Sequence, residues 1–355
     1  MNHKICFINS CKAWGGGEKW HFETANRLHE EGFDVLVITN NKSKLYEKLK
    51  KTTIKTHQFS IKNLSFLNPF KIRQLQGIIE KFNPSTVILG LPSDVKTGGI
   101  ASKRAGVKKI IYRRGTALPV KRTWLNQWLY NSVVTNIIAN SNEIQKLISK
   151  NFSRDFDSKK VQLIYNGIEI NKISLNHTRL DLERSSEDEI IMGNAGRLVE
   201  QKGQKYLIDL AAILKKENYK FKIYIAGSGK LQKELQSYIQ QKDVEKHVIL
   251  LDFIHNVPDF IKALDIFLFP SVHEGSANVL LEAMTLKKPV VAFRVSSIPE
   301  IVEHEKDGLL AEFKNTNSFA EEVIRLIDDE QFRDKLGENA RKKIIEKFNF
   351  DHTYR

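Results

Sequence analysis

Cysteine is scarce in this sequence, which has two thiols, Cys6 and Cys11, among 355 residues. One thiol inside the first strand-like run and one just after it do not provide a disulfide framework. Without a cluster of histidines and cysteines they do not form a zinc-site pattern either. We therefore expect a reduced, cytoplasmic setting and no metal.

Long apolar runs are also missing. A typical run, Ile266 to Phe269, has four residues, whereas a membrane-spanning helix needs about 20. The first residues hold one strand-length apolar run followed by polar residues, which is not the pattern of a signal peptide. A hydrophobic content of 41% excludes disordered and fibrous classes. The length predicts about two domains.

Acidic residues are scarce in the first half of the chain. Residues 1–170 carry 28 Lys and Arg against 12 Asp and Glu, whereas the remainder carries 28 against 30. The densest cationic stretch runs from Lys103 to Arg122. This asymmetry favours an anionic partner, which is a nucleic acid, an acidic membrane surface or an anionic substrate. Solvated faces explain scattered lysines, but they explain the run YRRGTALPVKR less well.

Short apolar runs alternate with helical patterns twice along the chain. In the first half, strands are expected at residues 4–10, 33–40, 86–91, 108–114 and 135–141, with a helix from about Glu18 to Glu31 that ends at Gly32. After a polar segment the alternation restarts, with strands expected within 190–198, 220–229, 248–253, 265–271 and 289–293. This pattern predicts two doubly wound α/β domains with parallel sheets. Their ligand site is expected in the cleft between the domains, beyond the carboxyl ends of the strands.

The domain boundaries follow from the composition. We expect a first domain over residues 1–170, a linker over 171–188 and a second domain over 189–345. Residues 346–355 form a tail that we expect to pack back on the first domain.

Three loops follow predicted strands and carry glycine or cations. Gly15, Gly16 and Gly17 precede a helix whose free N–H groups suit an anion, although a flexible turn explains them equally well. Gly227 and Gly229 form a second tight turn with the same two interpretations. Arg197 and Lys202 lie in a third loop, where a guanidinium fork and a point charge could clamp a diphosphate. Either cation alone is better explained as a solvated charge at a helix entry.

The stretch SVHEGSANVLLEAM places Glu274 and Glu282 on either side of a predicted helix start. Ser276 or Asn278 is the candidate N-cap. Glu282 then lies early in the helix, where the dipole favours an anion. Glu274 precedes the cap in a loop and has no such explanation. The two carboxylates can be an accident of the helix start, an acid/base pair, or two contacts to one ligand.

Taken together, these features resemble the retaining glycosyltransferases of family 4, which have the GT-B fold of two Rossmann-like domains facing a cleft. The resemblance rests on Arg197, Lys202, the Gly227–Gly229 turn and the stretch PSVHEGSANVLLEAMTLKKPVVA. It extends more loosely to GGGEKW, LHEEGFDVLVIT, IIANS and LIYNGI in the first half.

The resemblance implies a role for each matching residue. Arg197 and Lys202 would hold the diphosphate of a UDP-sugar or GDP-sugar, and Glu274 would contact the transferred sugar beside Gly275, Ser276, Ala277 and Asn278. Glu282 would bind the ribose. Ile254 and Val257 would lie at the base, and Gly16 and Gly17 near the phosphates. On this reading both glutamates are binders, because a nucleoside diphosphate leaves without a carboxylic acid, unlike the leaving group in glycoside hydrolysis.

The sequence departs from the family in its first half. Where many members have a histidine, this chain has Arg113 and Arg114, which suggests an anionic acceptor or sugar group contacted by these arginines and by Glu18. Asp155–Asp157 resembles the metal-binding Asp-x-Asp of another glycosyltransferase fold, but it follows a polar loop and is interpreted as surface. Trp124, Leu125, Trp128 and Leu129 have helical spacing beside basic residues. Core packing is favoured for them over contact with an anionic membrane.

The sequence thus favours a metal-independent, retaining hexosyltransferase with no cofactor, acting from a nucleotide-sugar on a cell-envelope glycan or lipid-linked acceptor, such as in lipopolysaccharide or other polysaccharide biosynthesis. We expect it in the cytoplasm, at the inner face of the membrane. A nucleotide-sugar epimerase of the same fold is the alternative within enzymes. A basic nucleic-acid-binding protein is the alternative outside them, but we expect no nucleic-acid partner, because the chain has no recognisable module for one.

Overall fold

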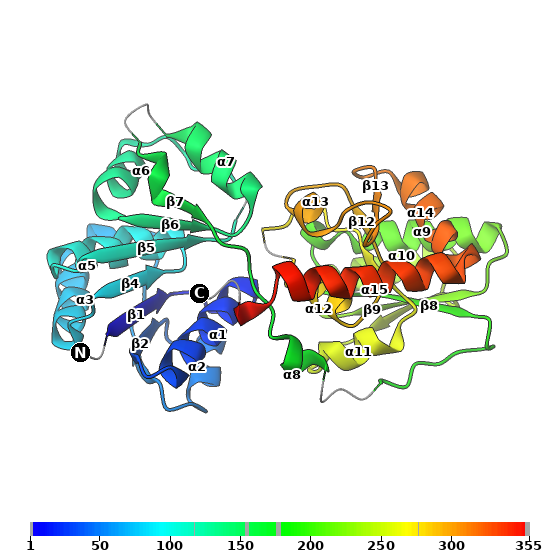
Figure 1. Cartoon of the computed structure of the whole chain (residues 1–355), viewed down its shortest axis with the longest axis horizontal. Helices are drawn as coiled ribbons and strands as arrows, with labels where there is room; N and C mark the ends of the chain where they lie inside the picture. Colours follow the sequence, from blue (N-terminus) through cyan, green and yellow to red (C-terminus); the bar gives the residue numbers. More distant parts are fainter. Residues whose placement is uncertain (1–2, 117, 153–155, 175–178, 276, 352–355) are drawn as a thin grey trace. The chain divides into compact units, whose positions relative to one another are not determined.

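The computed structural model describes residues 3–116, 118–152, 156–174, 179–275 and 277–351. The chain divides into two compact units, Met1–Tyr165 (unit 1) and Asn166–Arg355 (unit 2). Both are layered α/β units, with a sheet between helices (Figure 1).

Unit 1 is built on a seven-stranded parallel sheet in the order β3-β2-β1-β4-β5-β6-β7. The order reverses direction at β1, as in doubly wound folds. Its strands are β1 (Lys4–Asn9), β2 (Asp34–Thr39), β3 (Lys55–Gln58), β4 (Thr86–Leu89), β5 (Lys109–Arg114), β6 (Asn136–Ala139) and β7 (Val161–Leu163).

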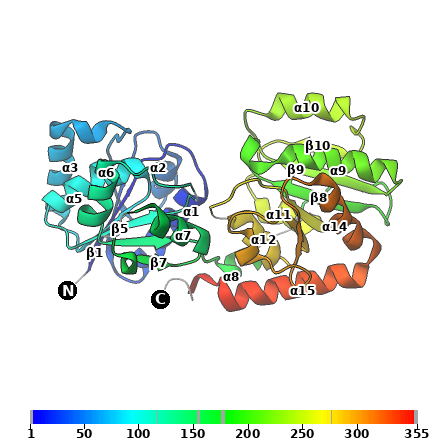
Figure 2. The ribbon, with the colours of Figure 1, turned by 90° about the horizontal axis from the view of Figure 1, so that it is seen from above.

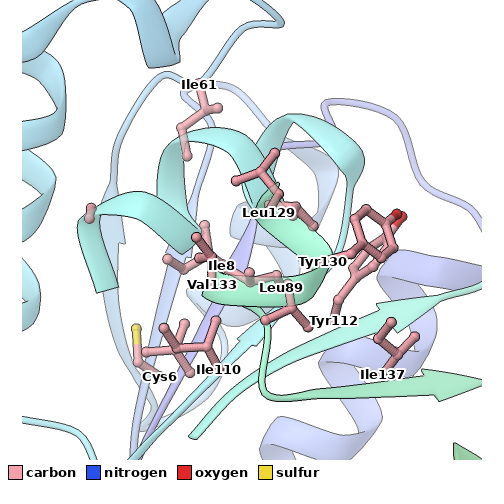
Figure 3. Packing of buried hydrophobic residues seen from close by; sticks show 14 of the residues in the cluster. Cys6, Ile8, Ile61, Leu89, Ile110, Tyr112, Leu129, Tyr130, Val133 and Ile137 are labelled. Carbon is pink, nitrogen blue, oxygen red and sulfur yellow. The ribbon is translucent and has the colours of Figure 1, made fainter. Parts of the chain in front are cut away.

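Helices cover both faces of this sheet, because alternate residues of each buried strand point to opposite sides. Ile8 packs with one helical layer, in which Leu129 and Val133 are buried (Figure 3). Phe7 packs with the other layer. The helices of unit 1 are α1 (Gly16–Glu30), α2 (Lys44–Leu49), η1 (Ser65–Leu67), α3 (Pro69–Phe82), α4 (Pro92–Asp94), η2 (Val95–Gly99), α5 (Ile100–Arg104), α6 (Trp124–Trp128), η3 (Leu129–Val133), α7 (Asn142–Asn151) and η4 (Ser158–Lys160).

Unit 2 has a six-stranded parallel sheet in the order β10-β9-β8-β11-β12-β13. Its strands are β8 (Ile190–Ala195), β9 (Phe221–Ala226), β10 (Val248–Leu251), β11 (Ile266–Phe269), β12 (Val290–Phe293) and β13 (Leu309–Ala311). Its helices are α8 (Ile170–Ser174), η5 (Glu200–Lys202), α9 (Gln204–Lys216), α10 (Gln232–Gln241), α11 (Val257–Ala263), α12 (Asn278–Thr285), α13 (Ile298–Ile301), α14 (Thr316–Asp328) and α15 (Glu330–Lys347), and Figure 2 shows α15 running along this unit.

Each predicted strand is confirmed in place, and the helix after β1 begins two residues before Glu18. The polar segment after residue 178 is held against unit 2. There Arg184 Nη2 lies 2.8 Å from Asp265 Oδ2, and Tyr224 Oη donates to the carbonyl of Glu183 at 2.7 Å. At the C-terminus, Phe350 N donates to Ile168 O at 3.0 Å, within unit 2. Packing of residues 346–355 on the first domain stays a prediction.

Two local expectations were wrong, and a third held for three of its four residues. The N-cap of α12 is Ala277, which has no side-chain cap, and Asn278 is the first helical residue. Glu282 lies beyond the first turn of α12, so the helix dipole is a weaker explanation for it. Core packing is confirmed for Leu125, Trp128 and Leu129, whereas Trp124, in the same apolar stripe, is 79% exposed. Strands β3, β7 and β13 were not predicted. The sequence of β3, KTHQ, is polar and its burial is slight, and β7 and β13 have only three residues each.

In the described part of the chain, no helix is long and apolar enough to cross a bilayer.

Candidate functional site

The carboxyl end of the unit 2 sheet brings two predicted residues into direct contact. Lys202 Nζ lies 2.6 Å from Glu274 Oε1, and the two are 72 positions apart in sequence. Glu274 is 3% exposed. Lys202 follows β8 and Glu274 follows β11, and these strands are neighbours in the sheet. The ammonium group also lies over the ring of Phe269, 5.6 Å from its centroid. The pair is therefore a partly buried charged site at the strand ends.

Gln201 holds the two loops of this pair together. Its side-chain Nε2 donates to the carbonyl of His273 at 2.8 Å, and its own carbonyl accepts from Val272 N at 2.9 Å. These two hydrogen bonds flank the Lys202–Glu274 contact. Sequence reasoning did not find Gln201, and its only sequence signal is its place beside Lys202.

The Gly227–Gly229 turn supports the loop that carries Arg197. A Cβ atom on Gly227 would lie 2.0 Å from Gly196 O, and one on Gly229 would lie 2.3 Å from Leu198 O. Leu198 N also donates to Ser228 O at 3.0 Å. The absence of a side chain on both glycines thus lets this turn pack closely against the loop of residues 196–198 in the same unit. Their predicted contact with a donor stays a prediction.

Arg197 itself is exposed, and no hydrogen bond or ion pair of its side chain is formed with the described residues. The carbonyl of Arg197 accepts from Gln204 Nε2 at 3.0 Å, which fixes the backbone of the loop while leaving the guanidinium in solvent. The guanidinium can therefore reorient toward an anion without breaking a described contact.

Several buried polar atoms at this end of the sheet have no partner among the described residues. Most buried polar atoms in proteins are hydrogen-bonded, so such a group is a signal for a binding site. None of these residues was predicted from the sequence. The atoms are Asn194 Oδ1, Gln204 Oε1, Ser271 Oγ, His273 Nε2 and Ser297 Oγ.

The other predicted donor contacts lie on the same unit, except Gly16 and Gly17, which begin α1 in unit 1. Glu282 and Ala277 are buried, and Gly275 is half-buried. Asn278 Oδ1 accepts from Asn166 Nδ2 at 2.9 Å. Ile254 is half-buried just before α11, which begins at Val257. Ser276 lies outside the described residues.

Unit 1 has a buried polar cluster at the carboxyl ends of β1 and β5. Asn9 Nδ2 lies 3.5 Å from Glu18 Oε1 and 3.3 Å from His21 Nδ1, which also lies 3.0 Å from Gly17 O. Burial lowers the pKa of His21 to about 3, and the nearby charge of Arg113 acts in the same direction. His21 is therefore neutral at pH 7. It was not predicted, although it follows Glu18 by three positions, one turn of the helix.

Arg113 belongs to this cluster. It is 3% exposed and its guanidinium lies over the Trp20 ring, 5.1 Å from the centroid. Burial lowers the pKa of Arg113 to about 10, while the charge of Glu18 opposes the shift. Arg113 thus stays cationic at pH 7. If Gly17 had a Cβ atom, it would lie 3.7 Å from Arg113 Nη1.

Arg114 points to the opposite face of the sheet, as the alternation of a strand requires. Its guanidinium donates to Tyr130 Oη at 3.4 Å and to the carbonyl of Leu118. The structure therefore brings Arg113 together with Glu18 and places Arg114 in the helical layer on the other side. Asp94 connects the loops that follow β1 and β4. Its Oδ2 accepts hydrogen bonds from Ser10 N at 3.2 Å and from Leu91 N at 3.0 Å.

Within the described ranges, no group of three or more His, Cys, Asp or Glu side chains is arranged to hold a metal ion. Asp155 lies outside those ranges, and Asp157 caps the short helix η4.

Two family models match the chain. The model "Glycosyltransferase Family 4" matches residues 14–172, and the model "Glycosyl transferases group 1" matches residues 181–343. The chain belongs to this family of glycosyltransferases. The two matches fall on unit 1 and unit 2 respectively, and both sheets are those of Rossmann-like domains.

Curated relatives of this chain include other glycosyltransferases. An uncharacterized glycosyltransferase of Methanocaldococcus jannaschii is 35% identical to this chain over the aligned residues. The alignment covers 54% of this chain and 51%, about half, of the relative's length. The Escherichia coli UDP-Gal:alpha-D-GlcNAc-diphosphoundecaprenol alpha-1,3-galactosyltransferase is 25% identical over 98% of this chain and 93% of its own length.

Solved structures of similar proteins show the same fold. The Anabaena protein HepE in complex with UDP and glucose superposes with a TM-score of 0.84 at 22% identity, covering 99% of this chain and 97% of that one. The likeness confirms the GT-B class of fold that the sequence predicted.

Proposed function

We propose that this protein is a retaining glycosyltransferase that moves a hexose-type sugar from a UDP-sugar or GDP-sugar to a cell-envelope glycan or lipid-linked acceptor. The observation that supports this best is the 2.6 Å contact between Lys202 and Glu274 at the carboxyl end of β8 and β11. Family membership and the name of one relative, which includes a diphosphoundecaprenol-linked sugar, support the substrate classes. We place the reaction in the cytoplasm, at the inner face of the membrane.

In this proposal Lys202 binds the donor diphosphate without releasing Glu274. An ammonium group has three N–H donors, so one can stay on the carboxylate while another contacts a phosphate oxygen. Arg197, whose side chain is in solvent, would close on the same diphosphate as a bidentate fork. Both cations offset the charge that grows as the nucleoside diphosphate leaves.

Glu274 binds and orients the transferred sugar rather than acting as an acid. Its second oxygen is available for a sugar hydroxyl while the first contacts Lys202. Glu282, buried in α12, would receive the ribose hydroxyls. Ile254 and the start of α11 at Val257 would lie at the base, with Gly275, Ala277 and Asn278 near the sugar.

The reaction itself needs no group on the enzyme that forms a covalent bond. The bond from the anomeric carbon to the diphosphate oxygen breaks, and the acceptor oxygen bonds to the same face of that carbon. The acceptor proton passes to the departing phosphate oxygen, which keeps atoms and charges in balance. The cluster around Arg113 and Glu18 would contact the acceptor or an anionic group on it.

A donor panel tests the proposal. The purified protein would be heated with each of several UDP-sugars and GDP-sugars, and the best donor would be incubated with candidate acceptors in the presence of a chelator. We expect an α-linked product from an α-linked donor, identified by its anomeric NMR signal, and no effect of the chelator. An inverted product would contradict retention. Isomerisation of the donor without acceptor would support the epimerase instead.

The matched variants are Lys202→Met and Lys205→Met. Lys205 is exposed on α9 and lies over the ring of Tyr238, away from Glu274. Removing the Lys202 charge should lower kcat/KM about 100-fold or more, as for other preorganised charges at a leaving group. Lys205→Met should keep wild-type kinetics. Equal activity in both variants would remove Lys202 from the site.

A further inference from the structure

One stretch of unit 1 is almost free of acidic residues. Between Glu47 and Glu143 the sequence has 17 Lys and Arg but two acids, Glu80 and Asp94. Asp94 is fully buried. Nearly the whole surface formed by this stretch is therefore cationic or neutral.

The same stretch exposes large apolar side chains. Leu64, Leu67 and Phe70, around η1 and the start of α3, are 69%, 65% and 79% exposed. Leu118 and Trp124 are 56% and 79% exposed. These five are most of the large exposed hydrophobics in the described residues. Single exposed apolar residues are ordinary, but a group of them marks an interaction surface.

Two lysines on one helix connect these apolar groups. Lys96 Nζ lies over the ring of Phe66, 5.4 Å from its centroid, and Lys103 Nζ lies over Trp128 at 6.0 Å. Trp128 in turn stacks on Trp124, with ring centroids 6.5 Å apart and planes 9° apart. η2 and α5 follow each other without a break, so Lys96 and Lys103 are about 10 Å apart along the helix.

The elements that carry these residues form one layer. α3 contacts α5, η1 contacts η2, and η2 contacts η3, which continues α6. Figure 2 shows α3, α5 and α6 next to one another at one side of unit 1. Leu64, Leu67, Phe70, Lys96, Lys103 and Trp124 therefore form a band of apolar tips and cations, called here the docking band.

We propose that the docking band binds the surface of an anionic phospholipid bilayer. Apolar tips that enter the acyl boundary, combined with lysines that meet anionic headgroups, are the two components of interfacial binding. A nucleic acid would use the cations but would leave Leu67 and Phe70 in water. This inference goes beyond the sugar-transfer reaction and does not depend on it.

Vesicle co-sedimentation tests the proposal on the full chain, without donor or acceptor. Vesicles of phosphatidylcholine with phosphatidylglycerol would be compared with vesicles of phosphatidylcholine alone. We expect binding to the anionic vesicles only, with a blue shift of tryptophan emission as Trp124 leaves water. The apolar variant Leu67→Ser with Phe70→Ser should weaken binding about tenfold or more. The matched control is Phe313→Ser, which changes an exposed phenylalanine of unit 2.

The cations have their own matched pair of variants. Lys96→Gln with Lys103→Gln should weaken binding and reduce its dependence on salt, because each removes a contact to anionic headgroups. Lys233→Gln with Lys246→Gln, at exposed positions of unit 2, should leave binding unchanged.

Three outcomes would overturn the proposal. In the first, the protein binds neutral vesicles as well as anionic ones. In the second, the apolar variant binds anionic vesicles as well as the wild type does. In the third, the protein self-associates in sedimentation velocity and the apolar variant does not. The last outcome would assign the band to a second copy of the chain. Since no substrate is present, failure here is distinct from failure of the transferase proposal.

Discussion

At the scale of single residues, burial sets the charge states of the unit 1 cluster. Burial raises the pKa of Asp94 from 3.8 to about 7, although its hydrogen bonds from Ser10 and Leu91 oppose the shift. Burial lowers the pKa of His21 to about 3. The two groups therefore affect stability with opposite slopes. As pH falls from about 6.5 to 3, the unfolded chain gains a proton on this histidine that the folded chain does not, and stability is lost.

The substitution Asp94→Asn separates the contribution of Asp94 to the pH dependence of stability from that of His21. Between about pH 4 and 7 the folded chain holds a proton on Asp94 that the unfolded chain has lost, so stability falls as pH rises through this window. Asparagine keeps an acceptor for Ser10 N and Leu91 N and does not ionise. The variant should therefore gain stability relative to wild type from pH 4 to 7, by up to about 4 kcal/mol for a three-unit shift. A pH-independent difference would contradict this account.

All four tryptophans lie in unit 1, at positions 14, 20, 124 and 128. Denaturant unfolding followed by tryptophan fluorescence therefore reports this unit and is the measurement for Asp94→Asn. The difference between the two proteins cancels the contribution of His21.

At the scale of elements, the turn after β9 is shaped by backbone contact. Gly229 packs against the carbonyl of Leu198, one residue after Arg197. Gly229→Ala should destabilise unit 2 by about 1–3 kcal/mol, because backbone has to move to admit the methyl group. It should also weaken donor binding, because the Arg197 loop moves with the turn. Far-UV circular dichroism measures the first effect and nucleotide titration the second.

Gly77→Ala is the matched control for this substitution. Gly77 lies within α3, and a Cβ atom there would meet nothing within 4 Å. Alanine should stabilise that helix by about 0.5–1 kcal/mol. Destabilisation by both alanines alike would mean that crowding at Leu198 is not the cause.

At the scale of the whole molecule, most residues proposed to hold the donor belong to unit 2, whereas the docking band belongs to unit 1. Donor binding stabilises the folded form by mass action, by about 2.7 kcal/mol at a concentration 100 times Kd. The best donor should therefore raise the circular-dichroism transition more than the tryptophan transition. In Lys202→Met the shift should disappear at the same donor concentration. A shift confined to the tryptophan signal would place the donor on unit 1.

The amino-acid sequence alone determined the family, the alternation of strands with helices and every strand except β3, β7 and β13, because buried strands and helix ends are local patterns. It also determined which loops carry Lys202 and Glu274. Only the tertiary structure decided that these two touch, since that contact depends on β8 lying beside β11 across 72 residues. The clamp by Gln201 and the burial of His21 have the same origin, because they depend on which strands and helices become neighbours. The separation of Arg113 from Arg114 is different, since adjacent residues of a strand point to opposite faces. Only the structure decided what each arginine meets on its face, because those partners come from distant parts of the chain.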